Sequence, residues 1–199
     1  AVTNTKVYDS TTASANIPAI TSGSIAAGDF ANFTQTYDTP NVGTSKILTP
    51  TGSVNDGNGG GNYLVTFANN STGVITARPI TVTADPKTKA FGSPDPAFTY
   101  SLTSGSLVGG DNFSGSLTRV AGENVGTYAI LRGSLTAGSN YNLTYVGANL
   151  TITARSLIVT ATGNGRVIAV NAESGQVSSQ WPGTGVTPAA GILTNPVVV

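Results

Sequence analysis

The chain has 199 residues, enough for one or two ordinary domains with cores of their own. Only 9% of its residues are Asp, Glu, Lys or Arg, and nine acids balance nine bases. A neutral, weakly charged chain argues against nucleic acid and against an anionic membrane surface as partners. The sequence has no Cys, His or Met, so it offers no disulfide, no thiolate metal site and no His base for a catalytic triad.

Composition also bears on where the protein works. No apolar run approaches the roughly 18 residues of a transmembrane helix, so we expect no membrane insertion, and no signal peptide is visible. Because the chain begins at Ala1 and lacks Met, we expect a processed protein or a fragment of a longer one. Few charges together with many Gly, Ser, Thr and Asn residues are usual for exported bacterial surface proteins.

In chain order, alternation of apolar and polar residues predicts short strands, and helix signals are nearly absent. The first predicted strands are residues 24–27, 33–37, 45–48 and 63–67. The later ones are residues 80–84, 97–102, 115–120, 127–135, 141–145, 150–154 and 157–161. Clusters of Gly, Asn, Asp and Pro separate these strands, for example at 55–62, 92–96 and 109–112. The sequence therefore predicts an all-β fold.

Two stretches about 77 residues apart are nearly the same. Residues 74–84 read VITARPITVTA, and residues 151–161 read TITARSLIVTA. Upstream landmarks keep their order in both copies: Gly-Asp at 28–29 and 110–111, Asn-Val-Gly-Thr at 41–44 and 124–127, and Asn-Tyr at 62–63 and 140–141. Self-similarity at a fixed period indicates a tandem array. We expect two modules, residues 1–78 and 79–155, followed by a partial third module or an assembly tail, residues 156–199.

The repeated stretch contains a shift in its alternation pattern. At Ala77-Arg78-Pro79, and again at 154–156, the apolar positions change phase, so the last strand of one module runs into the first strand of the next. A flexible tether would show a Gly/Ser tract here. We therefore predict small β-sandwich-like modules, immunoglobulin-like or β-grasp-like, that abut in a stiff, extended rod. A continuous parallel β-helix is the alternative architecture.

The landmarks resemble two repeat families of large bacterial adhesins. Residues 5–12 (TKVYDSTT), with the Gly-Asp, Asn-Val-Gly-Thr, Gly-Asn-Tyr and Ile-Thr-Ala landmarks that follow, resemble the YDG-type repeat, although Ser10 replaces its usual Gly. Residues 79–155 resemble the sister MBG-type (YGX) module. There, residues 89–98 (KAFGSPDPAF) match its Lys-Thr-Tyr-Gly-x-x-Asp-Pro-x-Phe pattern, with Phe91 in place of Tyr. The resemblance implies a mostly-β, stalk-forming module on the bacterial cell surface, with no catalytic residues.

After Ala161 the repeat stops. Residues 163–175 are faintly similar to part of a PQQ-type propeller blade, with turns at 164–165 and 173–175. A propeller needs about four to eight blades, so no quinone site follows and no cofactor is expected. The apolar end, residues 192–199, either folds back on the second module or pairs with the next subunit by strand addition. Of the two we favour a homopolymer whose contact is made by residues 156–199.

Catalysis is not expected. Asp29 and Asp111 occupy equivalent repeat positions and could in principle act as a carboxylate pair. Each, however, lies in a Gly-Asp turn signal, where Asp caps its own backbone. Asp38 and Glu123 precede the Asn-Val-Gly-Thr turns and are interpreted in the same way. We therefore predict that the protein is not an enzyme.

A weak calcium candidate lies in a Gly-rich stretch. Asp56, Asn58 and Asn62 place oxygen-bearing side chains at alternate positions, faintly like half a calcium loop. No Glu follows at the distance that such a loop requires. A plain Gly-rich hairpin turn is the alternative interpretation.

A covalent clamp is a further candidate. Some bacterial stalk domains join a first-strand Lys to a last-strand Asn beside a buried acid. Lys87 or Lys89, Glu123 and Asn149 have that chain order. Solvated side chains are the alternative interpretation.

Aromatic residues suggest the remaining alternatives. Trp181, the one Trp, either stacks on a sugar or anchors the tail, and Tyr63 and Tyr141 share a repeat position that suits a core. The leading function is a spacer of an extracellular bacterial adhesin or self-assembling surface filament, with neighbouring modules of the same chain as partners. The alternative is a carbohydrate-binding module that binds a surface glycan.

Overall fold

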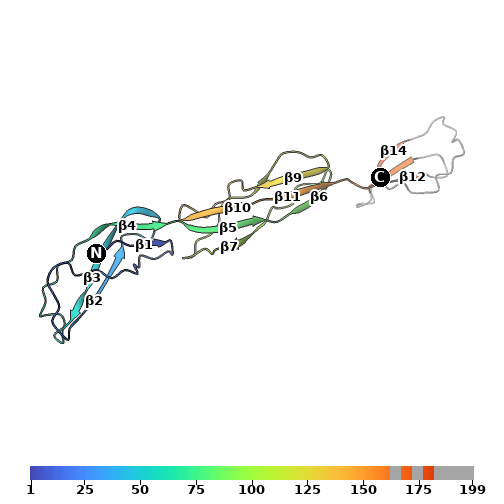
Figure 1. The fold of residues 1–199 in the computed structure, drawn as a ribbon. Helices are drawn as coiled ribbons and strands as arrows, with labels where there is room; N and C mark the ends of the chain where they lie inside the picture. Colours follow the sequence, from blue (N-terminus) through green and yellow to red (C-terminus); the bar gives the residue numbers. More distant parts are fainter. Residues whose placement is uncertain (162–166, 172–176, 182–199) are drawn as a thin grey trace.

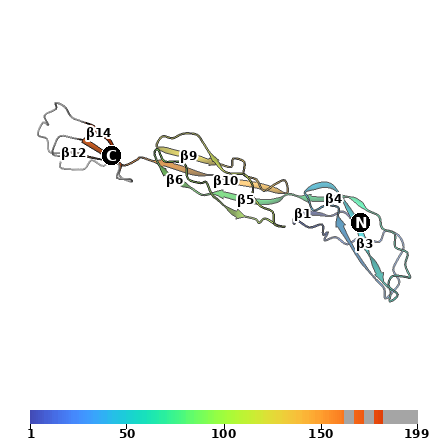
Figure 2. The same cartoon turned by 180° about the vertical axis from the view of Figure 1, so that it is seen from behind.

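The computed structural model describes residues 1–161, 167–171 and 177–181. Every regular element in these residues is a β-strand, which confirms the predicted all-β class. The elements follow one another along an elongated molecule, and the view from behind shows the same line (Figures 1 and 2). Among the described residues there is no helix with the length and apolar character needed to cross a membrane.

The first module is built on one sheet. Its strands are β1 (Thr5–Val7), β2 (Phe30–Tyr37), β3 (Gly43–Asn55) and β4 (Asn70–Thr76), in the order β1-β4-β3-β2. β4 runs parallel to β1 and antiparallel to β3, and β2 runs antiparallel to β3. Alternation along β2 buries Phe33, Gln35 and Tyr37 on one face of the sheet.

The second module is a sandwich of two sheets. One contains β6 (Lys87–Ala90), β8 (Thr118–Arg119), β9 (Gly126–Leu131) and β11 (Ala148–Thr153), in the order β6-β11-β9-β8. The other contains β5 (Arg78–Ala84), β7 (Tyr100–Ser104) and β10 (Tyr141–Val146), in the order β10-β5-β7. The first of these sheets repeats the strand order and pairing directions of the first module. The second sheet has no counterpart among the described strands of the first module.

Two groups of buried side chains form the cores. The core of the second module lies between its two sheets and consists of Val82, Ala84, Leu117, Ile130, Leu135, Leu150 and Ile152. The junction core draws on both modules and consists of Tyr8, Tyr37, Leu48, Ile75, Ile80, Ala137 and Tyr141. The two modules therefore share buried apolar surface.

The connection between the modules is one residue long. β4 ends at Thr76 and β5 begins at Arg78, so only Ala77 lies between them. Ile75 and Ile80 are both buried, although they are five positions apart, which is the predicted change of phase. The module boundaries at 78 and 155 stay predictions, because the junction core crosses the first of them.

Two predicted strand segments are absent from the described strands, and others are shorter than predicted. Residues 24–27 lead into the Gly-Asp turn instead, and residues 63–67 are extended but unpaired, because no described strand takes the place that β5 takes beside β10. The predicted strand 127–135 stops at Leu131. A turn follows, closed by the Leu135 N–H donating to the Arg132 carbonyl at 3.1 Å.

Beyond the second module, three strands form an antiparallel sheet. They are β12 (Leu157–Ala161), β13 (Val167–Asn171) and β14 (Val177–Trp181), in the order β12-β13-β14. The predicted turns at 164–165 and 173–175 and the apolar end at 192–199 lie outside the described residues. The environment of the Trp181 side chain is also outside the description, so its proposed role stays a prediction.

Candidate functional site: the junction between the modules

An aromatic pair lies at the centre of the junction. Tyr8 follows β1, and its N–H donates to the Thr76 carbonyl at 2.9 Å, which holds the end of that strand against β4. Tyr141 begins β10. The two rings meet edge to face, with centroids 5.5 Å apart, and both side chains are buried. Such pairs contribute about 0.5–1.5 kcal/mol beyond their buried area.

Both tyrosine hydroxyls donate to the same carboxylate. Asp111 Oδ2 accepts from Tyr8 Oη at 2.9 Å and from Tyr141 Oη at 2.8 Å. The Val108 N–H donates to Tyr141 Oη at 2.9 Å, and the Asp111 N–H donates to the Val108 carbonyl at 3.0 Å. Burial, and then the hydrogen bond to Asp111, raise the pKa of Tyr8, so its hydroxyl stays protonated at neutral pH. Asp111 therefore joins the modules as an acceptor.

Arg78 links the modules on one side of the aromatic pair. Its Nη1 donates to the Tyr8 carbonyl at 3.3 Å, which belongs to the first module. Its Nε and Nη2 donate to the carbonyl and hydroxyl of Ser106 at 2.9 and 3.0 Å, which belong to the second. One guanidinium therefore spans the junction, a task suited to its planar set of donors.

Asn140 makes a second link. Its Oδ1 accepts from the Val42 N–H at 3.0 Å, and its Nδ2 donates to Asn41 Oδ1 at 3.1 Å. Its carbonyl accepts from the Arg78 N–H at 2.9 Å. The Asn-Val-Gly-Thr landmark of one module thus meets the Asn-Tyr landmark of the next. The two modules are therefore linked by hydrogen bonds at separate points around a shared core.

The first module contains the same tyrosine–aspartate arrangement. Tyr63 Oη donates to Asp29 Oδ2 at 2.7 Å and accepts from the Ala26 N–H at 2.8 Å. The Asp29 N–H closes the turn on the Ala26 carbonyl at 3.1 Å. Asp29 and Asp111 thus belong to separate turns, each beside its own tyrosine, and the structure does not bring them together as a carboxylate pair. Tyr141 is buried and Tyr63 half-buried.

A compact ion network holds one end of the second module. Lys89 Nζ lies 2.6 Å from Asp95 Oδ1 and 2.6 Å from Glu123 Oε2. Arg119 binds the same two carboxylates, at 2.6 Å for Asp95. The hydrogen bonds from Arg119 and Lys89 lower the pKa of Asp95, and those from Lys89 and Arg119 lower that of Glu123. Glu123 was predicted to cap a turn, but it takes part in this network.

The covalent-clamp hypothesis is wrong in this structure. Lys87 and Lys89 are paired across the sheet with Leu150 and Ile152, so both side chains lie on the face of β11 that carries these two residues. Asn149 lies on the opposite face of β11 and is exposed. The Lys89 ammonium binds Asp95 and Glu123, and no bond-forming arrangement with Asn149 results.

The Gly-rich loop is closed by its own aspartate. Asp56 Oδ1 accepts from the N–H groups of Asn58 and Gly60 at 2.8 and 2.7 Å, and Oδ2 accepts from the Asn62 N–H at 2.9 Å. These bonds, led by those from Asn62 and Gly60, lower the pKa of Asp56. The calcium site at Asp56, Asn58 and Asn62 stays a prediction. The carboxylate oxygens of Asp56 already close a turn. In the described part of the chain no three His, Cys, Asp or Glu side chains group as metal ligands.

Similarly, Asp38 accepts from the Thr39 N–H at 2.9 Å, as a turn residue would.

Comparison with known proteins identifies both modules. Residues 1–72 match the family model of the YDG domain, and residues 80–151 match that of the MBG domain (YGX type). The chain therefore contains one domain of each family, as the resemblance predicted. Domains of both families occur in surface proteins, so the chain is a surface-protein module. Comparison with curated proteins gives no match, and neither does comparison with solved structures.

The shared carboxylate predicts the effect of removing one hydroxyl. Tyr8→Phe deletes the donor to Asp111 and keeps the ring pair, so we expect the free energy of unfolding to fall by about 1.5–3 kcal/mol, the usual worth of a hydrogen bond to a charged group. The control is Tyr37→Phe, because Tyr37 is equally buried and its hydroxyl donates to Val74 within the first module. We expect Tyr8→Phe, but not Tyr37→Phe, to speed the hydrogen exchange of the backbone amides of residues 105–113 in the second module. Equal effects of the two variants on that segment would contradict the bridging role.

The ion network predicts acid sensitivity of the second module. The pKa values of Asp95 and Glu123 lie below their ordinary 3.8 and 4.5. The network therefore stabilises the fold fully above the ordinary values. This stabilisation is lost as the pH falls below them and through the lowered pKa values of the folded protein. We expect the unfolding temperature to fall between pH 6 and pH 2, and to fall less steeply for Glu123→Gln. Thermal unfolding at several pH values checks this, and parallel curves for the two proteins would contradict it.

Proposed function

We propose that this protein is a rigid spacer of an extracellular adhesin or surface filament, which holds other modules away from the cell. The junction core supports the proposal most directly, because it draws on both modules. A one-residue connection and the links made by Asp111, Arg78 and Asn140 add to it. Domains tied in this way keep a fixed angle, whereas small, polar interfaces allow relative motion.

The direction of the strands suits a part under tension. β5, β10 and β11 run along the long axis of the molecule (Figure 1). A pull along that axis loads the backbone ladders along their strands, so that many hydrogen bonds resist together. β4 passes almost directly into β5, so tension travels through paired strands from one module to the next.

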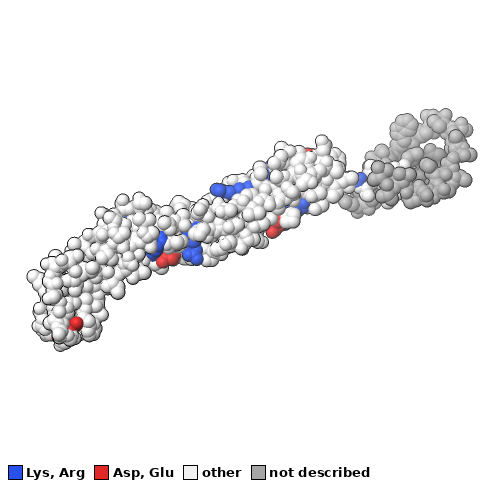
Figure 3. Space-filling view, in the orientation of Figure 1, with Lys and Arg blue, Asp and Glu red and all other residues white. Residues whose placement is uncertain are grey.

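The surface is consistent with a spacer. Few charges appear on the face in Figure 3, and they lie mostly near the junction and along the second module. Four of the protein's charged residues, Lys89, Asp95, Arg119 and Glu123, are engaged with one another in the ion network. A surface with little free charge gives weak long-range attraction to other macromolecules.

A linker inserted at the junction tests the spacer function. The chain is displayed on a cell or bead with a fluorescent head, and six Gly/Ser residues are inserted between Ala77 and Arg78. We expect the head to lie closer to the surface on average and its height to spread, because a Gly/Ser segment behaves as a flexible coil. The control carries the same insertion in the exposed Gly-rich loop at 57–60, where we expect no change in height.

Two outcomes would contradict the spacer function. One is an unchanged mean height when the linker is inserted at Ala77. The other is selective binding of the unaltered chain on a glycan array, which would favour the carbohydrate-binding alternative.

A further inference from the structure

One strand register runs through both sheets of the second module. β5 pairs in parallel with β10 in one sheet, and β6 pairs in parallel with β11 in the other. Arg78 lies opposite Tyr141 at the start of the first ladder, and Ala90 lies opposite Thr153 at the end of the second, so the partner is 63 positions later in both. The two ladders therefore form one parallel ribbon, made by residues 78–90 and 141–153, that passes from one sheet to the other.

Short connections carry the parallel ribbon between the sheets. Only residues 85 and 86 separate β5 from β6, and only Gly147 separates β10 from β11. The Asp85 N–H donates to the Thr99 carbonyl at 3.0 Å, and the Thr99 hydroxyl donates to the Asp85 carboxylate at 2.6 Å, which fixes the first connection. A load on β5 therefore passes directly to β6, and a load on β11 passes directly to β10.

The chain enters and leaves the parallel ribbon at opposite ends. β4 leads into the start of β5 through Ala77, and the end of β11 leads towards β12. β5 and β10 begin beside the first module, whereas β6 and β11 end on the side of β12 (Figure 1). A pull along the molecule thus draws β5 backwards by its first residue and β11 forwards by its last. The two strands of the ribbon are drawn in opposite directions along their length.

This direction of pull is the one that a parallel ladder resists best. The hydrogen bonds of such a ladder are evenly spaced, so a force along the strands loads them together. A force that draws the strands apart sideways loads one bond at a time, as in a zipper. Because forced unfolding is governed by the rate of unfolding, the bonds that must break together determine the force that the module withstands.

The side chains of the parallel ribbon also oppose sliding. Ile80 and Val82 of one strand and Leu150 and Ile152 of the other are at most 2% exposed. A slip by one residue would turn each of them to the opposite face of its sheet. A slip by two residues would move each of them out of the place into which it packs.

The ion network holds the second half of the ribbon to residues outside it. Lys89 belongs to β6, and its ammonium binds the carboxylates of Asp95 and Glu123, each at 2.6 Å. Both carboxylates lie outside residues 78–90 and 141–153. β6 therefore cannot slide past β11 without also breaking these ion pairs.

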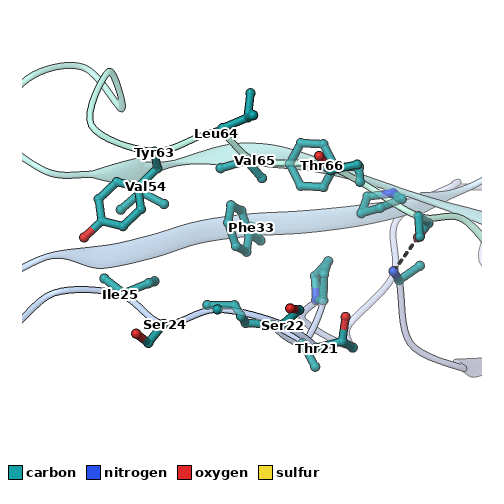
Figure 4. A pocket seen from close by; sticks show the side chains of 18 of the residues that line it. Thr21, Ser22, Ser24, Ile25, Phe33, Val54, Tyr63, Leu64, Val65 and Thr66 are labelled. Atoms are coloured by element: carbon teal, nitrogen blue, oxygen red, sulfur yellow. Dashed lines mark hydrogen bonds between the residues drawn. The ribbon is translucent and has the colours of Figure 1, made fainter.

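The described part of the first module shows one ladder of this kind. β1 pairs in parallel with β4, as β6 does with β11. The segment after the Asn-Tyr landmark, residues 63–66, lines a groove opposite residues 21–25, with Phe33 between them (Figure 4). Among the described residues, only the second module shows both ladders in one register.

We propose that the parallel ribbon sets the force at which the second module unfolds when the chain is pulled lengthwise. The load passes from β5 and β6 across the ladder to β10 and β11. It bypasses β7, β8 and β9, which lie between these pairs in the sequence and stabilise the fold without carrying the load. This property belongs to the second module itself, and its use at a cell surface rests on the proposed spacer function.

The direction of pull tests the proposal, and the chain has no cysteine of its own. Handles on Thr76→Cys and Ala154→Cys load the ribbon lengthwise. Handles on Phe91→Cys and Ala154→Cys draw apart two strand ends that lie side by side, since the Phe91 N–H donates to the Thr153 carbonyl at 2.9 Å. All three substituted positions are exposed. In the full chain we expect the lengthwise unfolding force to be at least about twofold the sideways force.

A substitution in the ribbon gives a second test. Since the Arg78 N–H donates to the Asn140 carbonyl at 2.9 Å, the alternation of a parallel ladder directs the Thr144 N–H towards β5. Thr144→Pro removes this donor at an exposed position, and we expect it to lower the lengthwise unfolding force by about half. The matched control is Leu135→Ala, which truncates a core side chain outside the ribbon. We expect the control to lower the melting temperature at least as much but the unfolding force less.

Equal unfolding forces in the two pulling directions would overturn the proposal, whether or not Thr144→Pro folds. A loss of force in Leu135→Ala as large as that in Thr144→Pro would overturn it as well. The linker insertion after Ala77 is independent of both results, because it tests the spacer function by the height of the head and not by force.

Discussion

The structure depends on a buried contact that neither module could complete alone. Two tyrosine hydroxyls, one from each module, donate to Asp111, and their rings pack within a core that includes Leu48 and Ile75 from one side and Ile80 from the other. Separating the modules would expose this apolar surface and leave a carboxylate without one of its donors. Because both costs rise together, we propose that packing and hydrogen-bond geometry set the angle between the modules; the one-residue connection leaves little chain to bend.

The same arrangement explains why the landmarks recur. At the junction, the Gly-Asp and Asn-Tyr landmarks of the second module lie beside the Asn-Val-Gly-Thr landmark of the first. In the second module, β5 follows β4 almost directly and is the central strand of the sheet β10-β5-β7. The second module completes its fold with a strand that continues directly from its neighbour. That dependence distinguishes the array from independent beads on a string, and it resembles the nearest-neighbour stabilisation of solenoid repeats.

Much of the fold could be predicted from sequence, because each pattern occurs twice and the two copies can be compared. The alternation in 80–84 predicted strand β5. The change of phase at Ala77 predicted the direct junction between the modules. Residues 63–67 have the same pattern as β10 but are unpaired, because pairing depends on a neighbouring strand that local pattern cannot reveal. The ion network was also missed: Lys89 and Asp95 lie in the family pattern, but Arg119 joins them only through the sheet. Ser10 has a φ of 67°, a left-handed conformation that explains why the family places Gly there.

The fixed angle between the modules is the central claim, and a distance distribution measures it most directly. Spin labels on Thr51→Cys and Thr144→Cys, both exposed in strands of different modules, report on the junction in a chain without other cysteines. Pulsed electron paramagnetic resonance should give one narrow distance, which broadens when six Gly/Ser residues are inserted after Ala77. A distribution in the unaltered chain as broad as that of the insertion variant would contradict the account.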